Sequence, residues 1–203
     1  MAFPEFFRHV PPLVLQDTLA ALLGATDDGV IEYRYEDAVR LAGHSCPTVA
    51  GAWLMARHGL VALYPNDLPQ RGGIRVELRG ALDAGTTGVV GSVLGLITGA
   101  AGEGGFKGLG GHHGRRNLLA YAVDMPSELR LTRLDTGASV LVDYHPEKVP
   151  PSPEIPPLMA RVVGGTADEE EHRAFAHLWQ ERVWRILVEN GQDSGLVHVK
   201  RLS

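Results

Sequence analysis

The sequence predicts an α+β fold in which helices pack against an antiparallel sheet. Apolar residues make up 44% of the 203 residues, which is ordinary for a protein with a buried core. In some segments apolar residues recur at helical spacing, and in others they alternate with polar residues as in a strand. The strand-like segments after residue 117 are short and separated by turn signals, which favours an antiparallel meander over helix-linked parallel strands. We expect a core over residues 1–148 and an appended segment over residues 149–203.

The N-terminal third of the chain predicts three helices. Residues 13–24 place several leucines on one helical face and end on Gly24, a common C-terminal stop. Residues 35–44 predict a second helix, which ends near Gly43. A third helix is expected from about Pro47 to Leu63, because apolar side chains recur along it at helical spacing: Val49, Trp53, Ala56 and Leu60.

The middle of the chain predicts a strand, an apolar helix and three further strands. Residues 74–80 alternate apolar and charged side chains, the pattern of a half-buried strand. Residues 87–98 are apolar and rich in small residues, and they predict a buried helix that another backbone can approach closely. The segments 118–124, 129–135 and 139–145 are short, rich in β-forming residues and bounded by turns.

The C-terminal segment predicts a strap followed by a long helix. Six prolines lie within residues 146–157, and we expect an extended strap there because proline fixes φ. Thr166 and Glu169 match a capping box at the start of the helix. Asn190 and the glycine after it would end the helix. Its apolar stripe indicates docking on the core or on a second copy of the chain.

Composition excludes several classes of function. The net charge is −5 with acids and bases mixed, whereas a nucleic-acid partner calls for a basic face. A single cysteine excludes an intramolecular disulfide and the common zinc fingers. The most apolar window is about 14 residues long, and a membrane span needs roughly 20. We therefore expect a soluble cytoplasmic protein without nucleic-acid or membrane partners.

The single cysteine, Cys46, lies in the stretch LAGHSCPTVAG, between a histidine and a proline. Proline is favoured at the first helical position, so Cys46 is predicted at the N-cap, where free N–H groups and the helix dipole stabilise a thiolate. His44 is close enough to be a proton partner or a second metal ligand. Cys46 and His44 are therefore our candidate catalytic and metal-binding residues. The alternative interpretation is a small, buried and inert cysteine.

A glycine-rich segment spans residues 99–117, and eight of the 16 residues from 99 to 114 are glycine. Such a loop can expose its N–H groups to a ligand, although it matches neither the Rossmann nor the Walker pattern. The alternative is a flexible surface loop. Among its polar groups, the candidate contacts to a cofactor or small molecule are Glu103, Lys107, His112, His113 and Arg116.

Three motifs together resemble the FmdE family, which takes its name from one component of formylmethanofuran dehydrogenase. They are GHSCPTVAGAWLM, RGGIRVELRG and TGAAGEGGFKGLGG, and the resemblance runs from about residue 35 to 145. It implies an α+β core, often dimeric, with a histidine and a cysteine lining a pocket that binds metal, most often zinc. The matching positions are His44 and Cys46. Many members carry a C-terminal zinc finger, which this chain lacks because no cysteine follows Cys46.

Three functions remain in competition. The first, implied by the resemblance, is a metal-binding protein, acting as an accessory subunit or a small-molecule-binding protein linked to one-carbon or redox metabolism. It would form a homodimer or dock on a redox-enzyme partner. The second is a metal-free cysteine enzyme with Cys46 as nucleophile and His44 as base. The third is a haem-binding module that ligates iron through Cys46.

Overall fold

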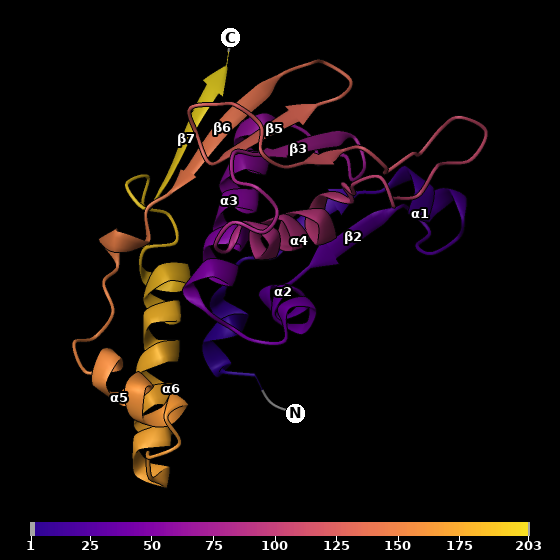
Figure 1. The fold of residues 1–203 in the computed structure, drawn as a ribbon. Helices are drawn as coiled ribbons and strands as arrows, with labels where there is room; N and C mark the ends of the chain where they lie inside the picture. Colours follow the sequence, from indigo (N-terminus) through magenta and orange to yellow (C-terminus); the bar gives the residue numbers. More distant parts are fainter. Residues whose placement is uncertain (1–2, 203) are drawn as a thin grey trace.

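A 17-residue helix, α3 (Pro47–Leu63), lies against one face of a five-stranded sheet in the computed structural model, which describes residues 3–202 (Figure 1). This arrangement confirms the predicted α+β class. The strands are β1 (Leu13–Gln16), β2 (Val30–Tyr33), β3 (Ile74–Leu78), β4 (Leu119–Ala120), β5 (Leu129–Arg133), β6 (Ser139–Tyr144) and β7 (Val197–Leu202).

Residues 3–202 form six α-helices and three short helical turns. They are α1 (Thr18–Leu22), α2 (Tyr35–Ala42), α3 itself, α4 (Thr87–Thr98), α5 (Ile155–Val163) and α6 (Glu169–Trp184), with short turns η1 (Glu5–His9), η2 (Pro146–Lys148) and the π-helical η3 (Arg185–Glu189). The helix α3 contacts β5, β6 and β7 as well as α2 and α4. Trp53, Leu54 and Leu60 of α3 are buried in the resulting core. Within residues 3–202, no helix has the length and apolarity to cross a membrane.

The main sheet has the strand order β4-β3-β5-β6-β7. Neighbours from β3 through β7 pair antiparallel, as predicted, and β3 exposes Arg75 on the face away from the core while burying Ile74 and Val76. The segment 118–124 forms only the two-residue β4, which pairs parallel with β3. The expected longer strand is wrong because Ala122 takes a positive φ of 56°, which an extended strand does not allow.

The prediction of one helix over residues 13–24 is also wrong. Residues 13–16 form β1, which pairs antiparallel with β2, and α1 begins only after Asp17. Leu13 and Leu15 are buried at strand spacing, whereas Leu22 and Leu23, expected on a buried face, are exposed. Pairing with β2 therefore decided the conformation of a segment whose leucines fit either period.

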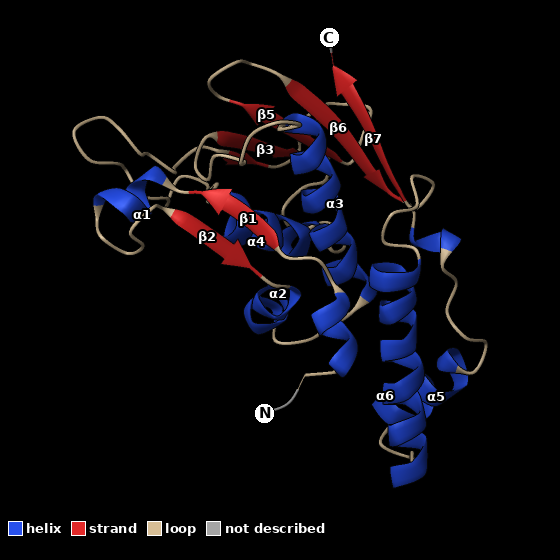
Figure 2. Cartoon of the chain, turned by 180° about the vertical axis from the view of Figure 1, so that it is seen from behind, coloured by secondary structure: helices blue, strands red, loops and turns tan. Residues whose placement is uncertain are grey.

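The C-terminal segment departs from prediction at three points. The strap is shorter than expected, because Pro156 and Pro157 lie in the first turn of α5, where proline is tolerated. The capping box of α6 consists of Asp168 and Glu171, and the Thr166–Glu169 pairing is wrong. An unpredicted strand, β7, follows the helix and pairs with β6. Figures 1 and 2 show α5 and α6 side by side, projecting away from the sheet.

Candidate functional site

Cys46 occupies the N-cap of α3, as the sequence predicts. Its backbone is extended, with φ −151° and ψ 168°, and its Sγ accepts a hydrogen bond from the Val49 N–H at 3.5 Å. Pro47 follows at the first helical position, where its missing N–H costs nothing. Cys46 as a whole residue is 8% exposed. The thiol sulfur is therefore held at the positive end of a 17-residue helix.

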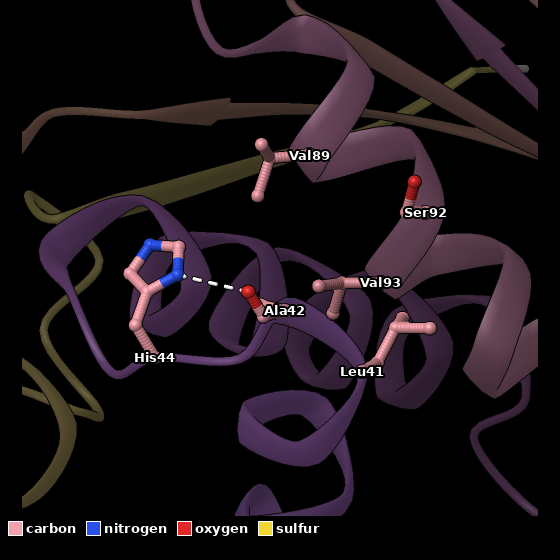
Figure 3. Close-up of a pocket in the computed structure, with 6 residues that line it drawn as sticks. All are labelled: Leu41, Ala42, His44, Val89, Ser92 and Val93. Atoms are coloured by element: carbon pink, nitrogen blue, oxygen red, sulfur yellow. Dashed lines mark hydrogen bonds between the residues drawn. The ribbon is translucent and has the colours of Figure 1, made fainter.

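His44 lies in the turn between α2 and α3, and its ring is exposed to solvent. Gly43 at the end of α2 takes a left-handed φ of 76°, which reverses the chain and presents the next residue outward. The Nδ1 atom of His44 lies 2.9 Å from the Ala42 carbonyl oxygen (Figure 3). In the tautomer that donates this bond, Nε2 carries a free lone pair.

A cavity of about 240 Å³ opens beside His44 (Figure 3). Its walls come from the end of α2 and the first half of α4, and are apolar apart from the imidazole and one hydroxyl. The lining residues are Leu41, Ala42, His44, Val89, Ser92 and Val93. The imidazole therefore borders a pocket in which an apolar group of a small molecule could be buried.

A second cavity of about 340 Å³ lies beside the first turn of α3. It is lined by Pro47, Thr48, Met55, Thr86, Val90, Glu128, Tyr144, Pro146 and Arg182. It is the more polar of the two and presents a carboxylate, a phenol and a guanidinium. Sequence reasoning missed Glu128, Tyr144 and Arg182, because they come from three elements distant in sequence and form no local motif.

Tyr144 connects this second cavity to the cysteine turn. Its hydroxyl donates to the Pro47 carbonyl at 3.1 Å, and its backbone N–H donates to Glu128 Oε2 at 3.1 Å. Its ring lies against Gly51 of α3, where a Cβ would overlap it. Burial raises the pKa of the Tyr144 hydroxyl, so this group stays a proton donor at neutral pH. Burial also lowers the pKa of Arg182.

The turn that carries Cys46 is fixed from two sides. From α2, the Tyr35 hydroxyl lies 3.1 Å from the Ser45 hydroxyl. From α6, Trp179 Nε1 and Gln180 Nε2 both donate to the Ser45 carbonyl, at 3.0 and 3.2 Å. The long C-terminal helix thus holds the motif in place, a role that its apolar stripe alone did not reveal.

The glycine-rich loop begins at the C-terminal end of α4, whereas the cavity beside His44 is walled by α4 residues from Val89 to Val93. The loop follows Gly99, which ends α4 in a left-handed conformation, and α4 is about 18 Å long at 1.5 Å per residue. Only His113 of the five candidates is half-buried, and its Nδ1 lies 3.2 Å from the Thr18 hydroxyl. The other four candidates are exposed: Glu103, Lys107, His112 and Arg116.

The structure does not bring these loop residues to the cysteine. Among residues 3–202, no three His, Cys, Asp or Glu side chains converge in a way that could hold a metal ion. The rings of His112 and His113 lie 6.4 Å apart, centroid to centroid. His44 and Cys46 therefore offer at most two metal ligands from one copy of the chain.

No family model and no curated protein matches the chain. Among solved structures, it is similar to a tungsten formylmethanofuran dehydrogenase FmdE-like protein from Syntrophus aciditrophicus, with 16% identity and a TM-score of 0.45. The match covers 84% of this chain and 73% of that one. Likeness at this level carries no inference about metal or activity.

Proposed function

We propose that this protein binds a divalent transition metal ion, zinc by preference, at the N-terminal end of α3. The Cys46 thiolate and the Nε2 atom of His44 would be two of its ligands. The observation that carries the proposal is the contact between His44 Nδ1 and the Ala42 carbonyl. Metal-ligating histidines commonly donate their second ring N–H to such a carbonyl, which fixes the tautomer and directs the other nitrogen at the metal.

The position of Cys46 supports the same proposal. Only the thiolate binds a metal, and the N–H of Val49 and the helix dipole both favour negative charge on Sγ. A buried thiolate without a partner would be costly, whereas a bound cation neutralises it. Serine is the better N-cap residue in general, so the cap alone gives no reason for a cysteine.

Two ligands from one chain define an open site, because zinc normally takes four. The remaining positions would be filled by water, by a small molecule in the cavity beside His44 or in the one beside the first turn of α3, or by a second copy of the chain in a homodimer. When bound, such an ion acts as a Lewis acid toward an oxygen or sulfur ligand. The chain would then serve as a small-molecule-binding or accessory protein of FmdE type.

The test is metal binding by tag-free protein. Zinc content and Co²⁺ titrations are measured for the wild type, Cys46→Ser and His44→Gln, with His9→Gln as a matched control at an exposed histidine. We expect the wild type to show a thiolate-to-Co²⁺ charge-transfer band. Cys46→Ser should lose the band, and His44→Gln should weaken affinity at least about tenfold. The control should match the wild type.

Two results would overturn the proposal. One is negligible zinc and no charge-transfer band in the wild type. The other is equal Co²⁺ affinity in all four proteins. The competing functions have their own signatures in the same preparations: a haem protein shows a strong visible absorption band. A metal-free cysteine enzyme shows alkylation of Cys46 by iodoacetamide well below the pH at which a free thiol near pKa 8.5 reacts.

A further inference from the structure

Two arginines share one buried carboxylate at the far end of α4. Arg71 Nη1 lies 2.9 Å from Asp17 Oδ2, and Arg115 Nη2 lies 2.7 Å from Asp17 Oδ1. Asp17 is the N-cap of α1, Arg71 precedes β3, and Arg115 lies in the glycine-rich loop. The three side chains are therefore brought together from separate segments of the chain.

This cluster carries an unbalanced positive charge. The Asp17 side chain is 4% exposed and that of Arg115 is 8% exposed. Burial alone would raise the pKa of Asp17, but the hydrogen bond from Arg71 and the charge of Arg115 lower it overall, so the carboxylate is ionised. Two guanidinium groups against one carboxylate leave one positive charge without a carboxylate partner, and the Arg71 guanidinium has the Tyr33 ring, with its centroid 5.6 Å away, as a further charge-stabilising contact.

The cluster also has hydrogen-bond donors to spare. Arg71 Nε and Arg115 Nη1 are buried and have no acceptor among the described residues. Arg71 Nη2 is satisfied by the Leu96 carbonyl at 3.0 Å. Buried donors of a charged group are almost always paired in folded proteins, so these two indicate that the cluster is incomplete by itself.

A cavity of about 250 Å³ opens onto the two arginines. It is lined by Thr18, Gln70, Arg71, Gly72, Gly73, His113 and Arg115. Gly72 takes a positive φ of 81°, and a side chain there would overlap the Arg115 guanidinium. Within residues 3–202 no carboxylate lines the cavity, and Asp17 beneath it is already engaged by both arginines.

We propose that this cavity, which we call the arginine cavity, binds a small oxyanion, either the carboxylate or the phosphate group of a small molecule. Arg71 and Arg115 are the charged donors, and the Thr18 hydroxyl and the His113 ring are further polar groups at the cavity wall. Guanidinium forks match the geometry of both oxyanions. The site is distinct from the cysteine turn and does not depend on a metal there.

The experiment titrates chelator-treated protein with inorganic phosphate and with acetate, against chloride at matched ionic strength. Binding is measured by calorimetry and by the shift in Tm. The variants are Arg71→Gln and, as a matched control, Arg75→Gln, an exposed arginine four residues further along. We expect one of the two oxyanions to bind the wild type and Arg75→Gln with equal affinity. The same anion should bind Arg71→Gln at least about tenfold more weakly.

The phosphate and acetate titrations distinguish a ligand with a phosphate group from one with a carboxylate, and they also test the proposal. Tighter binding of phosphate identifies a phosphate group, and tighter binding of acetate identifies a carboxylate. Binding of neither beyond the chloride control overturns the proposal, as does equal affinity in Arg71→Gln. If Arg71→Gln fails to fold, His113→Ala replaces it, because that ring is half-buried at the cavity wall, and unchanged oxyanion affinity in this variant overturns the proposal.

Failure here is distinguishable from failure of the metal site. Co²⁺ binding by Arg71→Gln should equal that of the wild type, because α4 separates the two sites. Phosphate or acetate binding by Cys46→Ser should likewise be unchanged.

Discussion

The cysteine turn and the arginine cavity lie at opposite ends of α4 and are built in opposite ways. At the cysteine turn, two functional side chains lie two residues apart and one short motif supplies both. At the arginine cavity, Asp17 is 54 residues from Arg71 and 98 residues from Arg115. A site built on a local motif can therefore be recognised in the sequence, whereas a site assembled by tertiary contacts leaves no such signal.

The two ends also differ in chemistry. The cysteine turn offers a thiol and an imidazole, which are ligands that suit zinc and similar metals. The arginine cavity offers the N–H groups of two guanidinium ions around a single carboxylate, and such charged hydrogen-bond donors suit an oxyanion. Each of the following substitutions is expected to act on one end only, so an effect at the other end would show that the two sites are coupled.

The largest effect is expected from Asp17→Ala. This change leaves the buried guanidinium of Arg115 and the half-buried one of Arg71 without a counter-charge, and it removes the α1 cap that accepts from the N–H groups of Leu19 and Ala20. We expect a loss of about 3–5 kcal/mol in the free energy of unfolding, measured by urea denaturation. The exposed Asp27→Ala should change stability by less than about 0.5 kcal/mol. Equal stability of the two variants would contradict a buried charge cluster.

The ionised Asp17 carboxylate also predicts that the stability of the protein falls in acid. The pKa of Asp17 is lower in the folded state than its ordinary value of 3.8, so its stabilisation is present above that value and is lost as pH falls through the folded pKa. We expect the urea midpoint of the wild type to fall more steeply than that of Asp17→Asn as pH drops from about 4.5 to 2.5. Parallel curves would show that Asp17 is not stabilised as an anion.

The contrast also explains what could be predicted from sequence. The bounds of α3 and α4 and the N-cap position of Cys46 followed from helical spacing and a cysteine–proline pair, both of which are local signals. The arginine cluster could not be predicted, because nothing near Asp17 in sequence indicates which arginines fold against it. Of the loop arginines, Arg116 was chosen as a candidate contact, yet it is exposed, whereas Arg115 is buried.

The errors in secondary structure have the same origin. Leu13 and Leu15 fit both a helix and a strand, and pairing with β2 selected the strand. The strand β7 was missed because its last three residues are all exposed, so its alternation of apolar and polar residues is weak. In both cases a partner distant in sequence decided the outcome, and local propensity did not contain that information.

At the cysteine end, Gly51→Ala tests the packing beneath Tyr144. Alanine normally stabilises a helix relative to glycine, but here its Cβ would overlap the Tyr144 ring. We expect a net loss of about 1–3 kcal/mol by urea denaturation, and weaker Co²⁺ binding because the Tyr144 bond to the Pro47 carbonyl is displaced. In a Tyr144→Ala background the cost should largely disappear. Additive effects in this double-mutant cycle would contradict the contact.

The smallest effect on stability, and the sharpest on function, is expected from Cys46→Ser. Serine is among the best N-cap residues, so it should accept from the Val49 N–H at least as well as the sulfur does at 3.5 Å. We expect the free energy of unfolding to stay within about 0.5 kcal/mol of the wild type, whereas Cys46→Ala should lose about 1 kcal/mol with the cap. Both variants should lose the thiolate-to-Co²⁺ band and keep oxyanion binding at the arginine cavity. A large loss of stability in Cys46→Ser would mean that the cysteine is kept for packing. Serine has nearly the same shape as cysteine and caps the helix as well, so only the packing of the larger sulfur atom could account for such a loss.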